Sequence, residues 1–170
     1  MTADARLLLV GLMGSGKSSV GRALAVRLQV PYVDNDREIA LLAGEPTVDL
    51  ATRGGDVLHQ WEAAYAAGLA QRPAPFVAGL PGSCADRPDE LEALRHSATL
   101  IYLRCDADTL VDRVSHDAPR PWLTTVDPRV FVEQTLARRD PVLLRLAQHV
   151  VDAGAPLPDV VEAVARLVAT

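Results

Sequence analysis

The sequence contains little lysine, few aromatic residues and little cysteine. Lys17 is the only lysine in 170 residues, and the other sixteen of the 17 basic residues are arginine. Aromatic residues make up 4% of the chain, and the two cysteines, Cys84 and Cys105, lack metal-ligand spacing and are too few for a disulfide scaffold. The net charge of −5 argues against nucleic acid or an anionic membrane as a main partner.

The length and the apolar content predict one globular domain. A chain of 170 residues, 49% of them hydrophobic, can bury one substantial core but is short for two, so we expect residues 1–170 to form a single domain. The first apolar run, residues 7–10, is much shorter than a signal sequence or a membrane span. We therefore expect a cytoplasmic monomer with neither a membrane nor a nucleic-acid partner.

Short apolar runs and amphipathic stretches alternate along the chain. Residues 6–10 form a continuous apolar run closed by glycine, typical of a strand buried on both faces, and residues 17–29 show the fourfold spacing of a helix. Further strands are predicted at residues 31–36, 74–79, 98–105 and 148–153, and further helices at residues 36–44, 47–54, 57–71, 88–96, 107–115, 127–146 and 157–168. This alternation predicts an α/β domain with three layers, in which helices cover both faces of a five-stranded parallel sheet.

A glycine-rich stretch lies between the first predicted strand and the first predicted helix. Residues 11–18, GLMGSGKS, match the pattern G-x-x-x-x-G-K-[ST]. Glycines allow such a loop to curl so that successive backbone N–H groups point at a phosphate, and the following helix adds the partial positive charge of its N-terminus. Lys17 is then placed to reach the β- and γ-phosphates, and Ser18 to offer its hydroxyl to Mg²⁺.

The same motif explains why one lysine is retained. A slim ammonium fits inside the curled loop, where a planar guanidinium would not. The alternative is a glycine-rich turn with no ligand, but composition alone produces this pattern in roughly one chain in a hundred. The sequence therefore predicts a site for ATP made by Gly11, Met13, Gly14, Ser15, Gly16, Lys17, Ser18 and Ser19.

Several motifs together resemble the shikimate kinase family. Residues 11–37 combine the phosphate-binding loop with a strand that ends in D-x-D, here DND. RPWL at residues 120–123 is similar to the family's lid motif R-P-L-L, and ARRDPVL at residues 137–143 is similar to a motif of its late helix. The resemblance implies a P-loop kinase fold that uses ATP and Mg²⁺. It places a small lid near residues 114–126 and an acceptor-binding helical region near residues 36–72.

The two acids of the DND motif are expected to serve two sides of the site. Asp34 and Asp36 stand two residues apart at the end of a predicted strand, where one is expected to face the water shell of Mg²⁺ and the other the acceptor. The resemblance assigns Asp34 to the metal, through water, and Asp36 to the acceptor hydroxyl, as a base or an orienting group. The alternative is ordinary turn chemistry, in which Asp36 caps the next helix.

Three arginines acquire roles from the resemblance. Arg113 is implied to lie against the adenine, and Arg120 to close over the phosphates as part of the lid. An arginine at the γ-phosphoryl group stabilises its negative charge, an effect of about 10³ to 10⁵ in rate in other enzymes. Arg139 corresponds to the arginine that binds the acceptor's carboxylate, whereas Arg138 is expected to be solvated. The alternative for Arg113 and Arg120 is a solvated surface position.

The chain departs from the family pattern on the acceptor side. The family carries G-E-x-x-F-R-x-x-E after the D-x-D region, but here His59 takes the place of the arginine while Glu62 is retained. A neutral imidazole cannot form the bidentate pair of a guanidinium with a carboxylate, so we expect roughly ten-fold weaker acceptor binding. The alternative for His59 is a half-buried histidine without a ligand. The family's triple-glycine turn reads GLPGS here, and the backbone of the retained Gly79 and Gly82 is expected to approach the acceptor.

These observations predict an ATP- and Mg²⁺-dependent kinase that phosphorylates a hydroxyl of a small molecule, with shikimate, giving shikimate 3-phosphate, as the first candidate. The expected catalytic residues are Lys17, Asp36 and Arg120. Acceptor binding is assigned to Asp36, His59, Gly79, Gly82 and Arg139, nucleotide binding to the loop with Arg113 and Arg120, and the metal to Ser18 and Asp34. Three alternatives stay open: a paralogue that phosphorylates another polyol or hydroxy acid such as gluconate, a nucleoside monophosphate kinase, whose fold would look similar from sequence, and a nucleotide-binding module without transfer activity.

Overall fold

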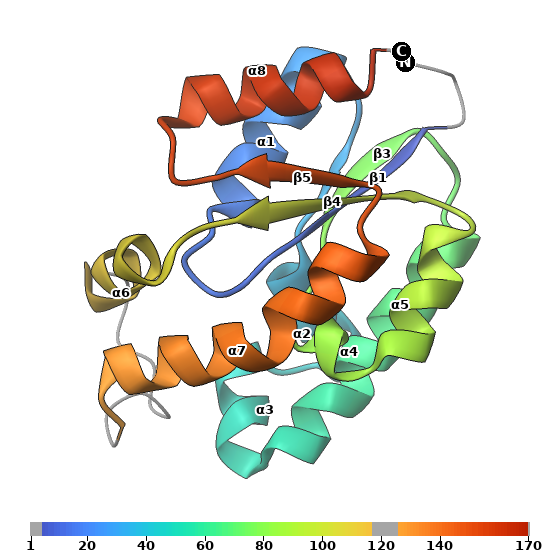
Figure 1. Ribbon diagram of the computed structural model, residues 1–170. Helices are drawn as coiled ribbons and strands as arrows, with labels where there is room; N and C mark the ends of the chain where they lie inside the picture. Colours follow the sequence, from blue (N-terminus) through green and yellow to red (C-terminus); the bar gives the residue numbers. More distant parts are fainter. Residues whose placement is uncertain (1–4, 117–125, 170) are drawn as a thin grey trace.

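A five-stranded parallel sheet forms the centre of the protein (Figure 1). The computed structural model describes residues 5–116 and 126–169. The strand order is β2-β3-β1-β4-β5, and all four pairings are parallel. The strands are β1 (Arg6–Val10), β2 (Tyr32–Val33), β3 (Phe76–Gly79), β4 (Thr99–Arg104) and β5 (His149–Asp152). The predicted α/β fold with a five-stranded parallel sheet is thereby confirmed.

Helices cover both faces of the sheet, which gives the three layers expected from the sequence. Figure 1 shows α1 (Lys17–Leu28) and α8 (Leu157–Leu167) above the sheet, with α5 (Pro88–Arg95) and α7 (Pro128–Leu146) below it. The remaining helices are α2 (Asn35–Ala43), α3 (Thr47–Arg53), α4 (Gly55–Gln71), the short 3₁₀ helix η1 (Gly82–Asp86) and α6 (Ala107–His116). Within the described ranges, no helix combines the length and the apolar character that crossing a bilayer requires.

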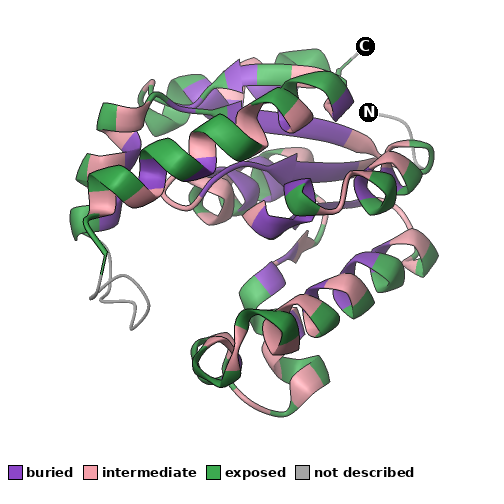
Figure 2. Ribbon diagram, turned by 60° about the horizontal axis from the view of Figure 1, so that its bottom comes forward, coloured by how far each residue is buried: buried purple, intermediate pink, exposed green. Residues whose placement is uncertain are grey.

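The core is centred on the middle strand β1. Leu8 and Leu9 are completely buried, and Leu8 pairs in register with Ala78 of β3 on one side and Leu100 of β4 on the other. A strand with neighbours on both edges and helices on both faces is shielded from water, and residues 7–10 of β1 are all buried. This explains why β1 has a continuous apolar run instead of an alternating pattern. Figure 2 shows the same result, since the buried residues are concentrated in the central strands.

One boundary differs from the sequence-based expectation at a position that matters for the site. Strand β2 ends at Val33, and Asp34 is the N-cap of α2, its carboxylate accepting a hydrogen bond from the Arg37 backbone N–H. Asp36 therefore lies in the first helical turn. The strand predicted over residues 31–36 therefore ends early, because local hydrogen bonding by Asp34 starts a helix directly after Val33. Helix capping does occur here, but by Asp34 and not by Asp36.

Candidate functional site

A cavity of about 1060 Å³ is lined by residues that follow the carboxyl ends of the strands. In an open parallel α/β sheet this is the edge where ligands bind. The cavity brings together most of the predicted site residues: Met13, Gly14, Ser15, Gly16, Lys17, Ser18, Ser19, Asp36, His59, Gly82, Arg113 and Arg139. Gly11, Asp34 and Gly79 do not line it. Arg120 and most of the predicted lid lie outside the described residues.

The glycines of the phosphate-binding loop allow its curled backbone. Gly14 and Gly16 have φ angles of 82° and 85°, a left-handed region that side chains disfavour. Gly11 is needed for a different reason. A Cβ atom there would lie 2.5 Å from the Ser15 hydroxyl oxygen and 2.7 Å from the Leu103 carbonyl oxygen. The chain at Gly11 can therefore pack closely against β4 and against Ser15 of the same loop, while residues 13–18 line the cavity.

Lys17 lies at the first position of α1, with its side chain folded back over the loop. The ammonium donates to the carbonyl oxygens of Gly11 at 2.8 Å and Leu12 at 3.0 Å. Within the loop, the Ser15 N–H donates to the Leu12 carbonyl at 3.1 Å. The only lysine of the sequence is thus held at the mouth of a glycine-rich loop by backbone carbonyls, which keeps its charge beside the cavity.

The two acids of the DND motif have different surroundings. Asp34 forms an ion pair with Arg22, whose Nη2 lies 2.9 Å from the Asp34 Oδ2. Asp36 lines the cavity, and its Oδ1 accepts a hydrogen bond of 2.9 Å from the side-chain amide of Asn35. Asp36 is therefore the acid of the pair that faces the cavity.

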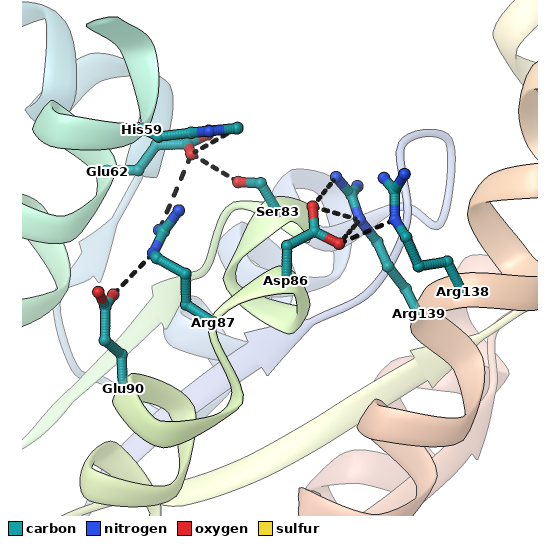
Figure 3. Close-up of polar contacts among 8 residues, drawn as sticks. All are labelled: His59, Glu62, Ser83, Asp86, Arg87, Glu90, Arg138 and Arg139. Carbon is teal, nitrogen blue, oxygen red and sulfur yellow. Dashed lines mark hydrogen bonds and ion pairs between the residues drawn. The ribbon is translucent and has the colours of Figure 1, made fainter. Parts of the chain in front are cut away.

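Three polar side chains surround the buried carboxylate of Glu62 on α4 (Figure 3). The Ser83 hydroxyl donates to the Glu62 Oε2 at 2.6 Å. His59 lies one helical turn before Glu62, with its Nε2 3.9 Å from the same oxygen, and Arg87 lies 4.0 Å from it. His59, Glu62 and Ser83 all line the cavity, so a ligand there meets one carboxylate, one imidazole and one hydroxyl.

A second ion pair in Figure 3 orients Arg139. Its guanidinium makes a bidentate contact with Asp86, with Nη2 2.6 Å from Oδ2 and Nε 3.1 Å from Oδ1, and Arg138 adds a hydrogen bond of 3.0 Å. Partial burial alone raises the pKa of the Asp86 carboxyl, but the hydrogen bonds and charges of the two arginines outweigh it and lower the pKa below its usual value. Arg138 is 62% exposed, as predicted, but it is also paired with Asp86.

Gly82 gives Arg139 access to the cavity. A Cβ atom on Gly82 would lie 3.0 Å from the Gly11 carbonyl oxygen and 3.5 Å from the Arg139 Nη1. The absence of a side chain therefore lets the turn after β3 approach both the phosphate-binding loop and the guanidinium. Gly79 lies deeper, at the end of β3, where the Tyr65 hydroxyl donates to its carbonyl oxygen at 2.7 Å.

Arg113 reaches the cavity from α6 and links three segments. Its Nη1 donates to the Ala153 carbonyl at 2.9 Å and to the Gly14 carbonyl at 3.3 Å, and it lies 3.6 Å from the sulfur of Cys105. These contacts join the phosphate-binding loop to the segment after β5. They give Arg113 a place beside the loop, while its predicted contact with adenine stays a prediction.

Three residues of the site were missed by sequence reasoning: Asn35, Ser83 and Asp86. Asn35 stands inside the DND motif, so its position between two acids was a usable signal. Ser83 and Asp86 belong to η1, a helix that the sequence pattern did not predict. No local pattern marks Asp86, because its partners Arg138 and Arg139 are more than fifty residues away in the chain.

Comparison with known proteins identifies the relatives of this chain. The family model for shikimate kinase matches residues 13–169. The shikimate kinase of Nitrobacter winogradskyi is 38% identical over 137 residues, which cover 80% of this chain and 64% of that protein. The shikimate kinase of Pseudomonas savastanoi pv. phaseolicola is 35% identical over 164 residues, which cover 95% of each chain.

Solved structures agree with these matches. Shikimate kinase from Acinetobacter baumannii in complex with shikimate has a TM-score of 0.89 at 25% identity, covering 97% of this chain and 93% of that chain. A gluconokinase from Sinorhizobium meliloti has a TM-score of 0.59 at 22% identity, covering 98% and 95% of the two chains. The likeness to the gluconokinase shows only that the two chains share a fold.

Proposed function

Because this chain belongs to the shikimate kinase family of small-molecule phosphotransferases, we propose that it transfers the γ-phosphoryl group of ATP to a hydroxyl of shikimate, giving shikimate 3-phosphate. The observation that carries the proposal is the shared cavity. The phosphate-binding loop with Lys17, the carboxylate of Asp36 and the guanidinium of Arg139 all line it. Groups suited to binding phosphate, accepting a proton and binding a carboxylate are thus available in one place.

In the proposed step, the acceptor oxygen forms a bond to the γ-phosphorus while the bond from that phosphorus to the β–γ bridging oxygen breaks. The electron pair of the broken bond stays on ADP, and the hydroxyl proton passes to Asp36. Lys17 and the lid residue Arg120 stabilise the negative charge on the transferred group. Glycine-loop N–H groups hold the phosphates in line, so most of the catalysis is positioning and charge stabilisation.

The residues present fit a hydrated Mg²⁺ ion. The hydroxyl of Ser18 lines the cavity beside the loop, and oxygen donors of this kind are the ligands that Mg²⁺ prefers. Because Mg²⁺ retains several waters and takes few protein ligands when phosphates are present, we assign Ser18 to direct contact and Asp34 to contact through water. When bound, the ion neutralises charge on the β- and γ-phosphates.

The acceptor is proposed to lie between α4, the turn after β3 and α7. Arg139 would bind its carboxylate, with His59 in the place of the family's second arginine and the backbone at Gly79 and Gly82 beneath the ring. Glu62 and Ser83 line the same wall and can bind acceptor hydroxyls. Because His59 carries no permanent charge, we propose that it binds the acceptor's carboxylate more weakly than an arginine would.

The remaining assignments follow from the same proposal. Arg113 is assigned to the adenine, residues 114–126 to a lid, and residues 36–72 to the acceptor-binding helices, within one domain over residues 1–170. We further propose a monomer that works in the cytoplasm with ATP and the acceptor as its ligands. The two cysteines are free and buried, which suits a reducing compartment.

A coupled assay for ADP release tests the function directly. The protein is incubated with ATP and Mg²⁺ and a panel that contains shikimate, other cyclic acids, gluconate, sugars and nucleoside monophosphates. Shikimate is expected to give the highest kcat/KM. A preference for gluconate would assign the chain to a different acceptor, and binding of ATP without any acceptor-stimulated turnover would indicate a nucleotide-binding module.

A further inference from the structure

Asn35 places a buried amide next to the carboxylate that faces the cavity. Its side chain is 8% exposed, and its Nδ2 donates to the Asp36 Oδ1 at 2.9 Å. We propose that Asn35 is a positioning residue: its amide occupies one oxygen of Asp36 and turns the other toward the acceptor hydroxyl. This inference rests on the proposed function, because it assumes that Asp36 takes the acceptor's proton.

The orientation of the Asn35 amide follows from its two neighbours. Turning the amide over would place its oxygen, in place of the nitrogen, 2.9 Å from a carboxylate oxygen, and two acceptors repel each other at that distance. The Asn35 Oδ1 points instead toward Gly79, where it would lie 2.9 Å from a Cβ atom. The amide thus donates to Asp36 on one side and packs its oxygen against a glycine on the other.

Gly79 is the reason that this arrangement can form. Any side chain at this position would meet the Asn35 Oδ1 and, at 3.1 Å, the Tyr32 hydroxyl oxygen. The strand end itself is fixed, since the Tyr65 hydroxyl holds the Gly79 carbonyl at 2.7 Å and Tyr65 is buried. The position of Asp36 is therefore tied through Asn35 to the rigid edge of the sheet.

Asp36 needs such a support because nothing else in its own helix supplies one. It is exposed in the first turn of α2, where a short side chain can adopt several rotamers. A hydrogen bond from a buried and ordered amide selects one of them before the acceptor arrives. Because transfer depends on the geometry of the reacting groups, a carboxylate that is not held should lower kcat and leave the binding of ATP unchanged.

Two variants of Asn35 test the inference. Asn35→Ala removes the amide, and Asn35→Asp keeps the shape but replaces the donor by a carboxylate oxygen. We expect both to lower kcat by about ten-fold at pH 8, the effect of one hydrogen bond to a charged group, with KM for ATP unchanged. Arg37→Ala, an exposed position in the same helical turn, is the matched control and should keep wild-type kcat.

The outcomes separate this inference from the proposed function. If Asn35→Asp keeps wild-type kcat, only the shape of the residue matters and the positioning role is wrong; a loss in Asn35→Asp without a loss in Asn35→Ala would overturn it too, as an effect of added charge. If Asp36→Asn abolishes transfer while both Asn35 variants turn over normally, the inference fails and the function stands. If wild-type protein transfers no phosphate to shikimate or any other acceptor, the proposed function itself fails.

Discussion

The two walls of the cavity are built from different parts of the chain. The phosphate wall consists mainly of backbone, shaped by Gly14 and Gly16, with Lys17 as its cation. The acceptor wall, the part that we propose to bind the acceptor, consists of side chains: Glu62 is held by Ser83, and Arg139 is held by Asp86 behind the cavity lining. A backbone loop offers the same N–H groups to any phosphate, whereas a wall of side chains can change its ligand by single substitutions. Loss of the phosphate wall should therefore abolish activity. Substitutions in the acceptor wall should instead change the affinity for the acceptor in graded steps.

The largest effect is expected at the phosphate wall. Lys17→Ala removes the ammonium that stabilises charge on the transferred group, so kcat should fall by at least about 10²- to 10³-fold. The fold should persist, because the hydrogen bonds from the ammonium to the Gly11 and Leu12 carbonyls lie within one loop and outside the hydrophobic core. Steady-state kinetics with circular dichroism checks both points. Arg27→Ala, a cation in the last turn of the same helix, is the control, and retained turnover in Lys17→Ala would contradict the assignment.

An intermediate effect is expected at Arg139. Arg139→Ala should raise KM for the acceptor by about 10- to 100-fold, because a charge-assisted pair with the acceptor's carboxylate is lost, while KM for ATP stays unchanged. The neighbour Arg138 shares Asp86 but is 62% exposed and does not line the cavity, so Arg138→Ala should leave the acceptor's KM within about two-fold. Equal effects of the two variants would show that Arg139 has no special role.

A smaller change, in the opposite direction, is expected at His59. His59→Arg adds a permanent charge to the acceptor wall, so KM for shikimate should fall by about ten-fold. His59→Gln, which keeps hydrogen bonding without charge, should not show this gain. Initial rates over a range of shikimate concentrations measure both. An unchanged or higher KM in His59→Arg would remove residue 59 from the acceptor site.

The smallest effect is expected at Asp86, in the pH dependence of the free energy of unfolding. The pKa of Asp86 is lowered in the folded state, so its ion pair with Arg139 stabilises the fold above the unfolded-state pKa and is lost as the pH falls through the lower folded-state pKa. Asp86→Asn should therefore reduce the free energy of unfolding by about 1 kcal/mol at pH 7, with a smaller difference from wild type below pH of about 4. Urea unfolding at several pH values measures it, and a difference that does not depend on pH would contradict this account.

The phosphate wall could be predicted from the sequence, and most of the acceptor wall could not. A continuous loop carries its motif in adjacent residues, and residues 13–18 of GLMGSGKS line the cavity, whereas Gly11 does not. The pair of Asp86 and Arg139 joins residues 53 positions apart, and no local pattern encodes such a contact. The course of the chain at Asp34 was also missed, because a side-chain cap, and not the strand pattern, decides where α2 begins.

Direct detection of the product tests the central claim that the loop presents a terminal phosphate to an acceptor held at Asp36. Wild-type protein and Asp36→Asn are each incubated with ATP, Mg²⁺ and shikimate, and the mixture is followed by ³¹P NMR and mass spectrometry. We expect stoichiometric shikimate 3-phosphate and ADP with wild type, and only traces of either with Asp36→Asn. Release of inorganic phosphate without a phosphorylated acceptor, or equal yields from the two proteins, would contradict it.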